Sequence, residues 1–309
     1  MKIFNSINDF SCSKKTILTL GTFDGVHIGH RKILEKLTKN TENENTESLV
    51  LTFFPHPRMV LKGQSDVKLL NTISEKIDLL EKIGVQNLVI HPFDEEFSKL
   101  SAEEFVKKVL VDRFHIQKII IGHDHRFGRN RTANIDDLIA FGEKYCFEVE
   151  QISVQEIKAV SISSTKIRNA LTEGKMALAN DYLGYEYFLT GTVIKGKQLG
   201  RTIGFSTANL MIEENDKLIP RNGVYVVKSI INQKTVFGMM NIGFNPTVAG
   251  EKLSIEVHYF DFDADLYDQE IRVSILEYLR SEQKFDSIPL LKEQLEKDKD
   301  AAWTYIKNL

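Results

Sequence analysis

The chain has 309 residues, with 40 basic and 43 acidic side chains and a formal net charge of −3. This length predicts two domains with buried cores, and the charge argues against bulk binding to nucleic acid or anionic membranes. Only two cysteines, Cys12 and Cys146, are present, so a disulfide framework is excluded and a reducing, cytoplasmic compartment is expected. We find no signal-peptide pattern at the start and no apolar run long enough to span a membrane.

Short apolar runs alternate with helical patterns over residues 1–184. Strands are predicted at Thr16–Leu20, Leu49–Phe54, Asn87–His91, Lys118–Gly122 and Phe147–Ile152. Helices are predicted between them at Arg31–Lys39, Ser74–Ile83, Ala102–Arg113 and Ile135–Tyr145. This alternation predicts a doubly wound, Rossmann-like α/β domain, in which ligands bind at the carboxyl ends of parallel strands.

From about Tyr185 the pattern changes to short strands without long helices between them. They are predicted at Leu189–Ile194, Ala208–Ile212, Val224–Asn232, Thr235–Asn241, Leu253–Phe262 and Glu270–Leu279. Such a series is typical of a small antiparallel barrel or sandwich. A final helix is expected after Asp286 as N-cap, with an apolar stripe formed by Ile288, Leu291, Leu295, Ala302 and Ile306. We place the domain boundary near Gly184, which gives domains of residues 1–184 and 185–309.

The first predicted strand runs into GTFDGVHIGH, residues 21–30, and then directly into a helix. Gly21 and Gly25 permit a tight turn, and the helix start offers free N–H groups that suit a phosphate. His27 and His30 are spaced to donate hydrogen bonds to that phosphate, as catalysis of phosphoryl or nucleotidyl transfer requires. The alternative is a glycine-rich turn with two surface histidines.

Further histidines are expected at the same edge of the sheet, namely His56, His123 and His125. Zinc binding is the alternative, but no carboxylate or thiol accompanies them in a familiar ligand spacing. The segments PHPR (residues 55–58) and HDHRFGRNR (residues 123–131) instead suit an anionic, aromatic ligand. Arg126, Arg129 and Arg131 add positive charge there, and Phe127 adds a stacking face, unless the segment is a solvated basic loop.

A third motif, ISSTKIR, occupies residues 162–168. Its hydroxyls at a helix start, followed by Lys166 and Arg168, form either a second phosphate site or a plain helix cap. Together with the first motif, it resembles the nucleotidyltransferases of the class I synthetase-like α/β fold. With TFFPHPR and GHDHRFGRNRTAN, the region resembles the FMN adenylyltransferase module of bacterial bifunctional riboflavin kinase/FAD synthetases.

The resemblance implies two sets of binding residues in this module. For the phosphates of ATP it implies Gly21, Phe23, Asp24, Gly25, Ser164, Thr165 and Arg168, in addition to the catalytic His27 and His30. Asp24 would shape the turn and help to orient the nucleotide or its metal. For the flavin it implies Pro55, His56, Asp124, Arg126, Phe127 and Gly128. The family often has Phe at His125 and Gly at Ala133, so these two departures concern the flavin pocket.

The second domain carries GTVIKGKQLGRTIGFSTANL, residues 191–210. Its ATP-binding candidates are Gly196, Lys197, Gly200 and Arg201. A glycine loop between two strands can wrap phosphates with its N–H groups, although an ordinary hairpin has the same composition. Thr207 and Asn209 lie two positions apart on a strand, so their oxygens point the same way and suit Mg²⁺ with ATP.

Glu256 lies in the middle of a predicted strand and is expected to face the same way as Ser254 and His258. A carboxylate inside a small barrel is costly unless it has a partner or a role, such as a general base for a substrate hydroxyl. The alternative is a solvated glutamate on an edge strand.

This half resembles the riboflavin kinase module, a six-stranded barrel with a terminal helix. The motifs are GRTIGFSTAN (residues 200–209), NGVY (222–225), NIGFNPT (241–247) and YLRSEQKFDS (278–287). The resemblance implies that Thr207 and Asn209 bind ATP-bound Mg²⁺, that Glu256 is the base, and that Arg280 and Phe285 lie near the isoalloxazine. Ser206 replaces a usual proline, so a looser loop is expected, and Asp268 replaces a frequent glycine of a turn.

The two resemblances imply phosphorylation of riboflavin to FMN and then adenylylation of FMN to FAD. The expected partners are small molecules: riboflavin, FMN, FAD and ATP with Mg²⁺. No nucleic acid or membrane partner is expected, and an oligomer is left open. Three alternatives stay open: a different nucleotidyltransferase, a non-catalytic flavin-binding module, and a chain with only one active module.

Overall fold

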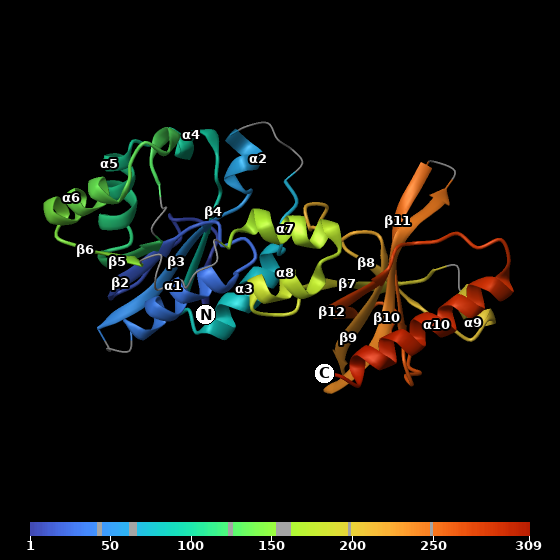
Figure 1. The fold of residues 1–309 in the computed structure, drawn as a ribbon. Coiled ribbons are helices and arrows are strands. Elements are labelled where there is room, and N and C mark those ends of the chain that lie inside the picture. The colour runs from blue at the N-terminus through green and yellow to red at the C-terminus, as the bar shows by residue number, and fades with distance from the viewer. Residues whose placement is uncertain (42–44, 62–66, 123–125, 153–161, 197–198, 248–249) are drawn as a thin grey trace. The chain divides into compact units, whose positions relative to one another are not determined.

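The computed structural model describes the chain except for residues 42–44, 62–66, 123–125, 153–161, 197–198 and 248–249 (Figure 1). The chain separates into two compact units, Met1–Ser164 and Thr165–Leu309, which are described in turn. In the part of the chain that the structure covers, no helix is both long enough and apolar enough to cross a membrane.

The first unit is built on a six-stranded parallel sheet in the order β1-β4-β3-β2-β5-β6. The strands are β1 (Lys2–Phe4), β2 (Lys15–Leu20), β3 (Thr46–Phe53), β4 (Asn87–His91), β5 (Ile116–Gly122) and β6 (Glu148–Ile152). From β2 the chain builds outward through β3 and β4, and then returns to the other side of β2 with β5. The predicted doubly wound fold is therefore confirmed. The three-residue edge strand β1 was not predicted, because it is too short to show a period.

The helices of this unit confirm the predicted positions, with one change in geometry. They are α1 (Ile28–Lys39), α2 (Pro57–Leu61), α3 (Ile73–Ile83), α4 (Glu95–Ser98), α5 (Ala102–Phe105) and α6 (Ile135–Tyr145), with a short 3₁₀ turn at Arg129–Arg131. The single helix expected over Ala102–Arg113 is α5 followed by a π-helix, Val106–Val111. The wider turn keeps Val106, Val109 and Leu110 buried against the sheet.

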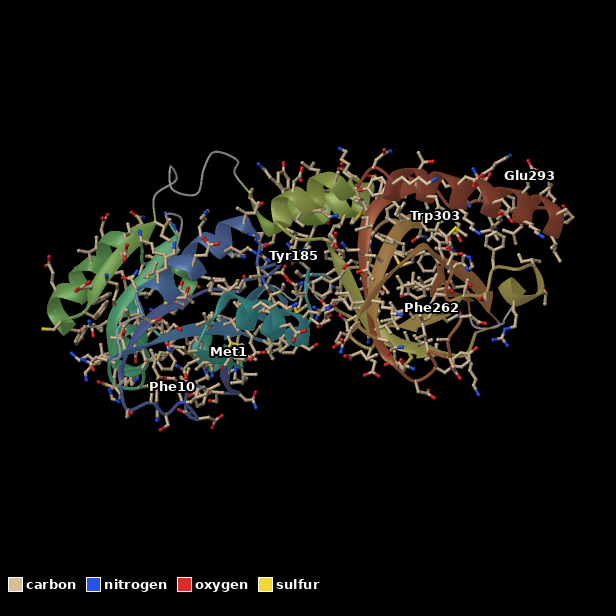
Figure 2. All side chains as sticks on the ribbon, turned by 90° about the horizontal axis from the view of Figure 1, so that it is seen from below. Met1, Phe10, Tyr185, Phe262, Glu293 and Trp303 are labelled. Carbon is tan, nitrogen blue, oxygen red and sulfur yellow. The ribbon has the colours of Figure 1, made fainter. Side chains whose placement is uncertain are left out.

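Continuous apolar runs in the central strands form the core, as expected for strands that are covered on both faces. Leu18, Leu49 and Leu51 are fully buried. Phe10, in the segment before β2, closes one side by edge contacts to Phe4 and Phe114, each with ring centroids 5.1 Å apart (Figure 2).

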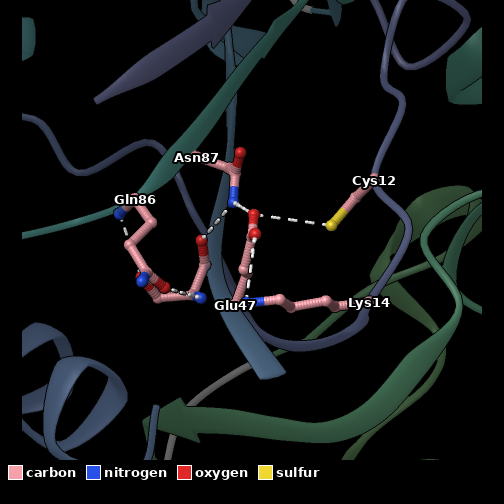
Figure 3. A network of polar contacts seen from close by, with 6 residues as sticks. Cys12, Lys14, Glu47, Gln86 and Asn87 are labelled. Atoms are coloured by element: carbon pink, nitrogen blue, oxygen red, sulfur yellow. Dashed lines mark hydrogen bonds and ion pairs between the residues drawn. The ribbon is translucent and has the colours of Figure 1, made fainter. Parts of the chain in front are cut away.

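Polar side chains join the amino ends of the strands, opposite the edge where ligands are expected (Figure 3). The Glu47 carboxylate accepts hydrogen bonds from Nδ2 of Asn87 at 2.9 Å and from Sγ of Cys12 at 3.4 Å, and Lys14 lies 3.9 Å away. Burial and this carboxylate raise the pKa of the Cys12 thiol. Cys12 thus serves the packing of β3 and β4 as a protonated thiol.

The helix α7 (Ser164–Glu173) starts at the last residue of the first unit and continues into the second, where α8 (Met176–Leu183) follows it. The second unit then forms a closed antiparallel barrel in the order β10-β11-β8-β7-β12-β9. The strands are β7 (Phe188–Ile194), β8 (Ala208–Met211), β9 (Gly223–Ile231), β10 (Lys234–Thr247), β11 (Gly250–Tyr259) and β12 (Glu270–Arg280), with the short helix α9 (Leu199–Thr202) after β7. All six predicted strands are confirmed, and β10 extends six residues beyond the predicted end at Asn241. The side chain of Asn180 in α8 donates a hydrogen bond to the carbonyl of Ile275 in β12, which anchors α8 to the barrel.

The terminal helix α10 (Ile288–Ile306) packs on the barrel through its second half. The N-cap is Ser287, so the prediction of Asp286 is wrong: Ser287 is the last extended residue, and Pro289 occupies the first turn. Ala302 is buried, and the Trp303 ring stacks on Phe260 with centroids 5.3 Å apart. Ile288, predicted as part of the apolar stripe, is 60% exposed, because the core contacts of the helix begin only at Leu295.

A buried ion pair fastens α10 to the end of β12. Arg280 donates from Nε to Oδ1 of Asp298 at 2.8 Å and from Nη2 to Oδ2 at 2.6 Å. Gln294 adds a third hydrogen bond to the same carboxylate at 2.9 Å. Only 4% of the Asp298 side chain is exposed, so its removal would leave the guanidinium without its counter-charge in a poorly solvated place.

We expect Asp298→Ala to lower the free energy of unfolding of the second unit by about 3 kcal/mol or more. Urea denaturation followed by the fluorescence of Trp303, the single tryptophan, measures this directly. Asp300→Ala, at an exposed position of the same helix, is the matched control. A loss of less than about 1 kcal/mol in Asp298→Ala, the value of a surface pair, would contradict the prediction.

Candidate functional site

The turn between β2 and α1 has three residues in the left-handed region. Phe23 has φ of 45°, Gly25 of 89° and Val26 of 37°. Only glycine adopts such angles without cost, and a β-branched residue such as Val26 is strained there. Full burial of the Phe23 and Val26 side chains holds the turn in this conformation. Strain of this kind concentrates at functional sites, where the surroundings over-determine the backbone.

Asp24 fixes this turn through its side chain and through its backbone carbonyl. Its Oδ1 accepts a hydrogen bond from the backbone N–H of Leu70 at 2.8 Å, and its carbonyl accepts one from Oγ of Ser164 at 2.9 Å. The side chain is almost completely buried. The structure thus gives Asp24 the turn-shaping role, and it brings Ser164, the first residue of α7, to the turn as predicted.

His27 and His30 lie together at the start of α1. His27 is the N-cap, and its Nδ1 accepts the backbone N–H of His30 at 3.4 Å. The two rings are stacked, with centroids 3.6 Å apart. Because Nδ1 of His27 is an acceptor, the proton of a neutral ring is on Nε2, where it can be donated to a ligand. Nδ1 of His30 is buried and has no hydrogen-bond partner among the residues that the structure describes.

Both imidazoles are neutral at physiological pH. Burial lowers the pKa of His27 to about 4, although the Asp24 carboxylate acts in the opposite direction. Burial also lowers the pKa of His30 well below its ordinary value, and electrostatic interactions with His27 and Lys76 act in the same direction. The pair can therefore donate hydrogen bonds to phosphate oxygens but does not bring positive charge to them.

The buried cation beside this turn is Lys76 of α3, which we did not predict as a site residue. Its Nζ donates a hydrogen bond to the carbonyl of Thr22 at 2.8 Å. The signal in the sequence is its spacing: Lys76, Leu79 and Leu80 follow the i, i+3, i+4 pattern of a buried helix face. A lysine on such a face needs a buried partner.

The structure describes some of the predicted flavin-binding residues of this unit. Pro55 follows Phe54 through a cis peptide bond, and Nδ1 of His56 accepts the N–H of Arg58 at 3.1 Å. Phe127 is buried in the core near Phe105 instead of presenting an open face, and Gly128 follows it with φ of 73°.

Other predicted residues stay predictions for different reasons. Asp124, His123 and His125 lie outside the described residues, as do the side chain of Arg131 and the residue Lys197 of the second unit. Arg126 and Arg129 are exposed. Ala133 is buried and pairs with Phe127 through two backbone hydrogen bonds. Thr165 and Arg168 belong to the second unit, and their contact with the phosphates stays a prediction.

No group of three or more His, Cys, Asp or Glu side chains arranged to hold a metal occurs within the described ranges. The zinc alternative for the histidines therefore gains no geometric support from the histidines that are described.

The predicted residues of the barrel converge on Glu256. Its Oε2 accepts a hydrogen bond from Oγ1 of Thr207 at 3.3 Å, and its Oε1 accepts one from Oγ of Ser254 at 2.9 Å. Asn209 is the register partner of Glu256 across β8 and β11, so the two side chains share a face. A carboxylate, a hydroxyl and an amide oxygen on one face are hard donors of the kind that Mg²⁺ takes.

The glycine loop lies against this face. A side chain at Gly196 would overlap the amide of Asn209, so the close approach of the loop requires glycine there. Gly200 lies in α9 beside Arg201. Ser206, where a looser loop was expected, is anchored by Nδ1 of His258, which lies 2.8 Å from its carbonyl oxygen.

A cavity of about 400 Å³ opens beside Thr207. Arg201, a predicted ATP-binding residue, lines it together with Ser206, Asp263, Asp265 and Tyr267. The last three were not predicted, and the acidic run DFDAD (residues 261–265) between two strands was a signal only for the two aspartates. Asp268 has φ of 61°, so it adopts the left-handed geometry that aspartate tolerates in a turn.

Arg280 and Phe285, predicted near the isoalloxazine, lie close to each other, with the guanidinium carbon 5.9 Å from the ring centroid. The guanidinium is already bound by Asp298. Its observed contacts therefore orient α10, and its contact with a flavin stays a prediction.

We expect the His27 ring to titrate near pH 4 and the His30 ring also far below the ordinary value of 6.5. Histidine-selective NMR spectra over a pH series measure this, with the urea-unfolded chain as the reference. Between pH 6.5 and about 4, these histidines are protonated in the unfolded chain but stay neutral in the folded chain. The free energy of unfolding therefore falls as the pH drops through this range. A midpoint near 6.5 for both rings in the folded protein would contradict their burial.

Comparison with known proteins matches both units. The family model of FAD synthetase matches residues 9–166, and that of riboflavin kinase matches residues 183–306. The two family models end and begin at residues 166 and 183, and the compact units divide after Ser164. The domain boundary near Gly184 therefore stays a prediction. A solved structure described as a macrolide-efflux protein from Streptococcus pneumoniae has a TM-score of 0.87 and 29% identity over 97% of each chain, which supports the fold.

Curated relatives match over almost the full length. The bifunctional riboflavin kinase/FMN adenylyltransferase of Listeria monocytogenes is 38% identical over 95% of this chain and 93% of its own. That of Bacillus subtilis is 38% identical over 96% of this chain and 94% of its own. With both family models in this order, the chain belongs to the family of bifunctional riboflavin kinases/FMN adenylyltransferases, enzymes of FAD biosynthesis.

Proposed function

We propose that this chain makes FAD from riboflavin in two steps, with the residues around Glu256 forming FMN and those around His27 and His30 adenylylating it. The observation that carries the proposal is that each set of predicted catalytic side chains is assembled within its own compact unit. Thr207, Ser254 and Glu256 are joined by hydrogen bonds in the barrel. The two histidines are stacked at a helix start in the other unit.

In the first step, the ribityl 5′-hydroxyl of riboflavin attacks the γ-phosphorus of ATP. Glu256 accepts the proton of that hydroxyl, FMN forms and ADP leaves. The hydroxyls of Thr207 and Ser254 fix the orientation of the carboxylate. Thr207 and Asn209 would hold Mg²⁺ with ATP, and the cation would neutralise charge on the phosphates. Gly196, Lys197, Gly200 and Arg201 would surround the phosphates, and Arg280 and Phe285 would adjoin the flavin.

In the second step, a phosphate oxygen of FMN attacks the α-phosphorus of a second ATP, and pyrophosphate leaves. His27 and His30 donate hydrogen bonds to the oxygens on which charge develops, without a covalent intermediate. Ser164, Thr165 and Arg168 would hold the β- and γ-phosphates. Catalysis then rests on position and on fixed donors, which the strained turn provides.

We place both steps in a reducing cytoplasm. The proposal is supported by Cys12 and Cys146, which are both free thiols. Structural disulfides are typical of oxidising compartments and free thiols of the cytosol.

The test is to incubate the purified chain with riboflavin, ATP and Mg²⁺ and to separate the flavins at successive times. FMN that appears and then gives way to FAD supports both steps. FMN that accumulates without FAD would refute the second step. Unchanged riboflavin, with supplied FMN converted to FAD, would refute the first. If neither flavin changes, both steps are refuted and the alternative of a non-catalytic flavin-binding module is favoured.

We expect replacement of both His27 and His30 by Ala to reduce FAD formation at least about 100-fold, because the donors to the developing charge are lost. FMN formation should be spared, since the barrel is unchanged. His115→Ala, at an exposed position of the same unit, is the control. Near-normal FAD synthesis in the double variant would refute the role of the pair.

We expect Glu256→Ala to reduce FMN formation by about 100-fold or more, because the acceptor of the hydroxyl proton is removed. The same variant should still convert supplied FMN to FAD. Glu270→Ala, at the exposed start of β12, is the matched control. If riboflavin phosphorylation survives in Glu256→Ala, the general-base role is wrong.

A further inference from the structure

Lys76 is a buried lysine whose ammonium group is directed at the catalytic turn. Only 5% of the residue is exposed. Its Nζ donates to the carbonyl of Thr22 at 2.8 Å, and the hydroxyl of Thr52 lies 3.3 Å from the same oxygen as a second donor. Thr22 directly precedes Phe23, the first left-handed residue of the turn. The carbonyl is therefore held where the strained backbone begins.

The start of α3 braces Lys76 in this position. Thr72 and Glu75 form a capping box: Oγ1 of Thr72 accepts the N–H of Glu75 at 3.2 Å, and Oε2 of Glu75 accepts the N–H of Thr72 at 3.0 Å. Just before it, Leu70 donates its N–H to Asp24. The segment from Leu70 to Lys76 therefore grips the turn at two points, Thr22 and Asp24.

The charge of Lys76 acts on His30. It is among the causes that lower the pKa of His30 in α1, after burial and His27. Burial lowers the pKa of Lys76 itself to about 8, and the Asp24 carboxylate opposes that shift. On its own helix, Glu75 also carries charge, but its carboxylate is engaged in the capping box. At neutral pH the Lys76 amino group is thus still mainly protonated, whereas the two imidazoles are neutral.

We propose that Lys76 is a positioning residue for adenylyl transfer, whose charged ammonium group fixes the Thr22 carbonyl and supplies the positive charge behind His27 and His30. It touches neither FMN nor ATP in this role. The inference rests on the proposed function of the two histidines, since it concerns how the turn presents them to a phosphate. Anionic phosphates favour a site with fixed positive charge, and the histidines do not provide it.

The test compares Lys76→Met with Lys82→Met, an exposed lysine on the same helix, in the full chain. FAD formation from supplied FMN is measured for kcat and for the KM of ATP and FMN. We expect kcat in Lys76→Met to fall about 100-fold, the effect of a small misplacement of catalytic groups. Both KM values should change much less, and FMN formation from riboflavin, in the other unit, should be unchanged. An unchanged kcat would overturn the proposal.

A second readout separates charge from mere packing. Removing the positive charge of Lys76 should raise the pKa of His30, which histidine-selective NMR measures in the same variant. A fallen kcat with an unchanged or lower His30 pKa would overturn the charge contribution that the proposal requires.

If Lys76→Met fails to fold, Lys76→Gln decides, because it keeps a donor for Thr22 without the charge. A kcat at least about tenfold lower in folded Lys76→Gln supports the proposal, and a wild-type kcat overturns it. A wild-type chain that makes no FAD, or a His27/His30 double variant that makes it normally, would instead refute the proposed function and not this inference alone.

Discussion

The proposed adenylyltransferase site depends on a turn that is held in backbone conformations which its residues normally avoid. Phe23 and Val26 adopt left-handed angles that side chains normally avoid. They stay there because their side chains are buried, because Asp24 is bonded to Leu70 and Ser164, and because Lys76 holds the preceding carbonyl. The same turn ends at His27, the N-cap of α1. The same contacts that hold the strained backbone of the turn therefore also set the position of the two histidine rings.

The barrel solves a different physical problem. In the proposed role Glu256 accepts a proton, so its carboxylate needs to be accessible to a substrate and still be oriented. It lies on the half-buried face of β11, opposite to the buried Ile255 and Val257. Two hydroxyls supply that orientation: Ser254 on the same strand, and Thr207 just before the neighbouring strand β8. The register of β8 with β11 sets Asn209 opposite Glu256, and the glycine at 196 lets the phosphate loop approach that amide. Strand pairing and the glycine loop beside it thus bring the proposed kinase residues together.

The sequence predicted most of the fold, because its signals are local. The long apolar strands and amphipathic helices show their periods within a few residues, and β2 to β6 and β7 to β12 lie where expected. The failures have physical reasons. β1 is too short to show a period, and Ile288 follows the stripe of α10 but lies before the first core contact of the helix. Ser287 rather than Asp286 caps that helix because the choice depends on backbone angles that both residue types can adopt.

The residues of the candidate sites were predicted from motifs, but their burial and their protonation states were not. His27, His30, Thr207, Asn209 and Glu256 come from recognisable spacings, and the structure brings each set together. Burial, however, is a property of the whole unit: no local pattern indicates that Phe127 belongs to the core, or that both histidines are uncharged. Lys76 was overlooked because a lysine in a helix usually faces water.

The neutral histidines change the way in which charge has to be arranged for adenylyl transfer. A protonated imidazole at a helix N-terminus would be opposed by the positive end of the dipole and by desolvation, which favours the neutral form. A neutral ring can still donate a hydrogen bond, so the two functions of a cationic donor are divided here. The imidazoles give direction to the phosphate oxygens, and charge comes from Lys76 beneath the turn. Because a buried ammonium is oriented by a carbonyl and cannot follow the substrate, it stabilises one geometry of the phosphate, as a preorganised site requires.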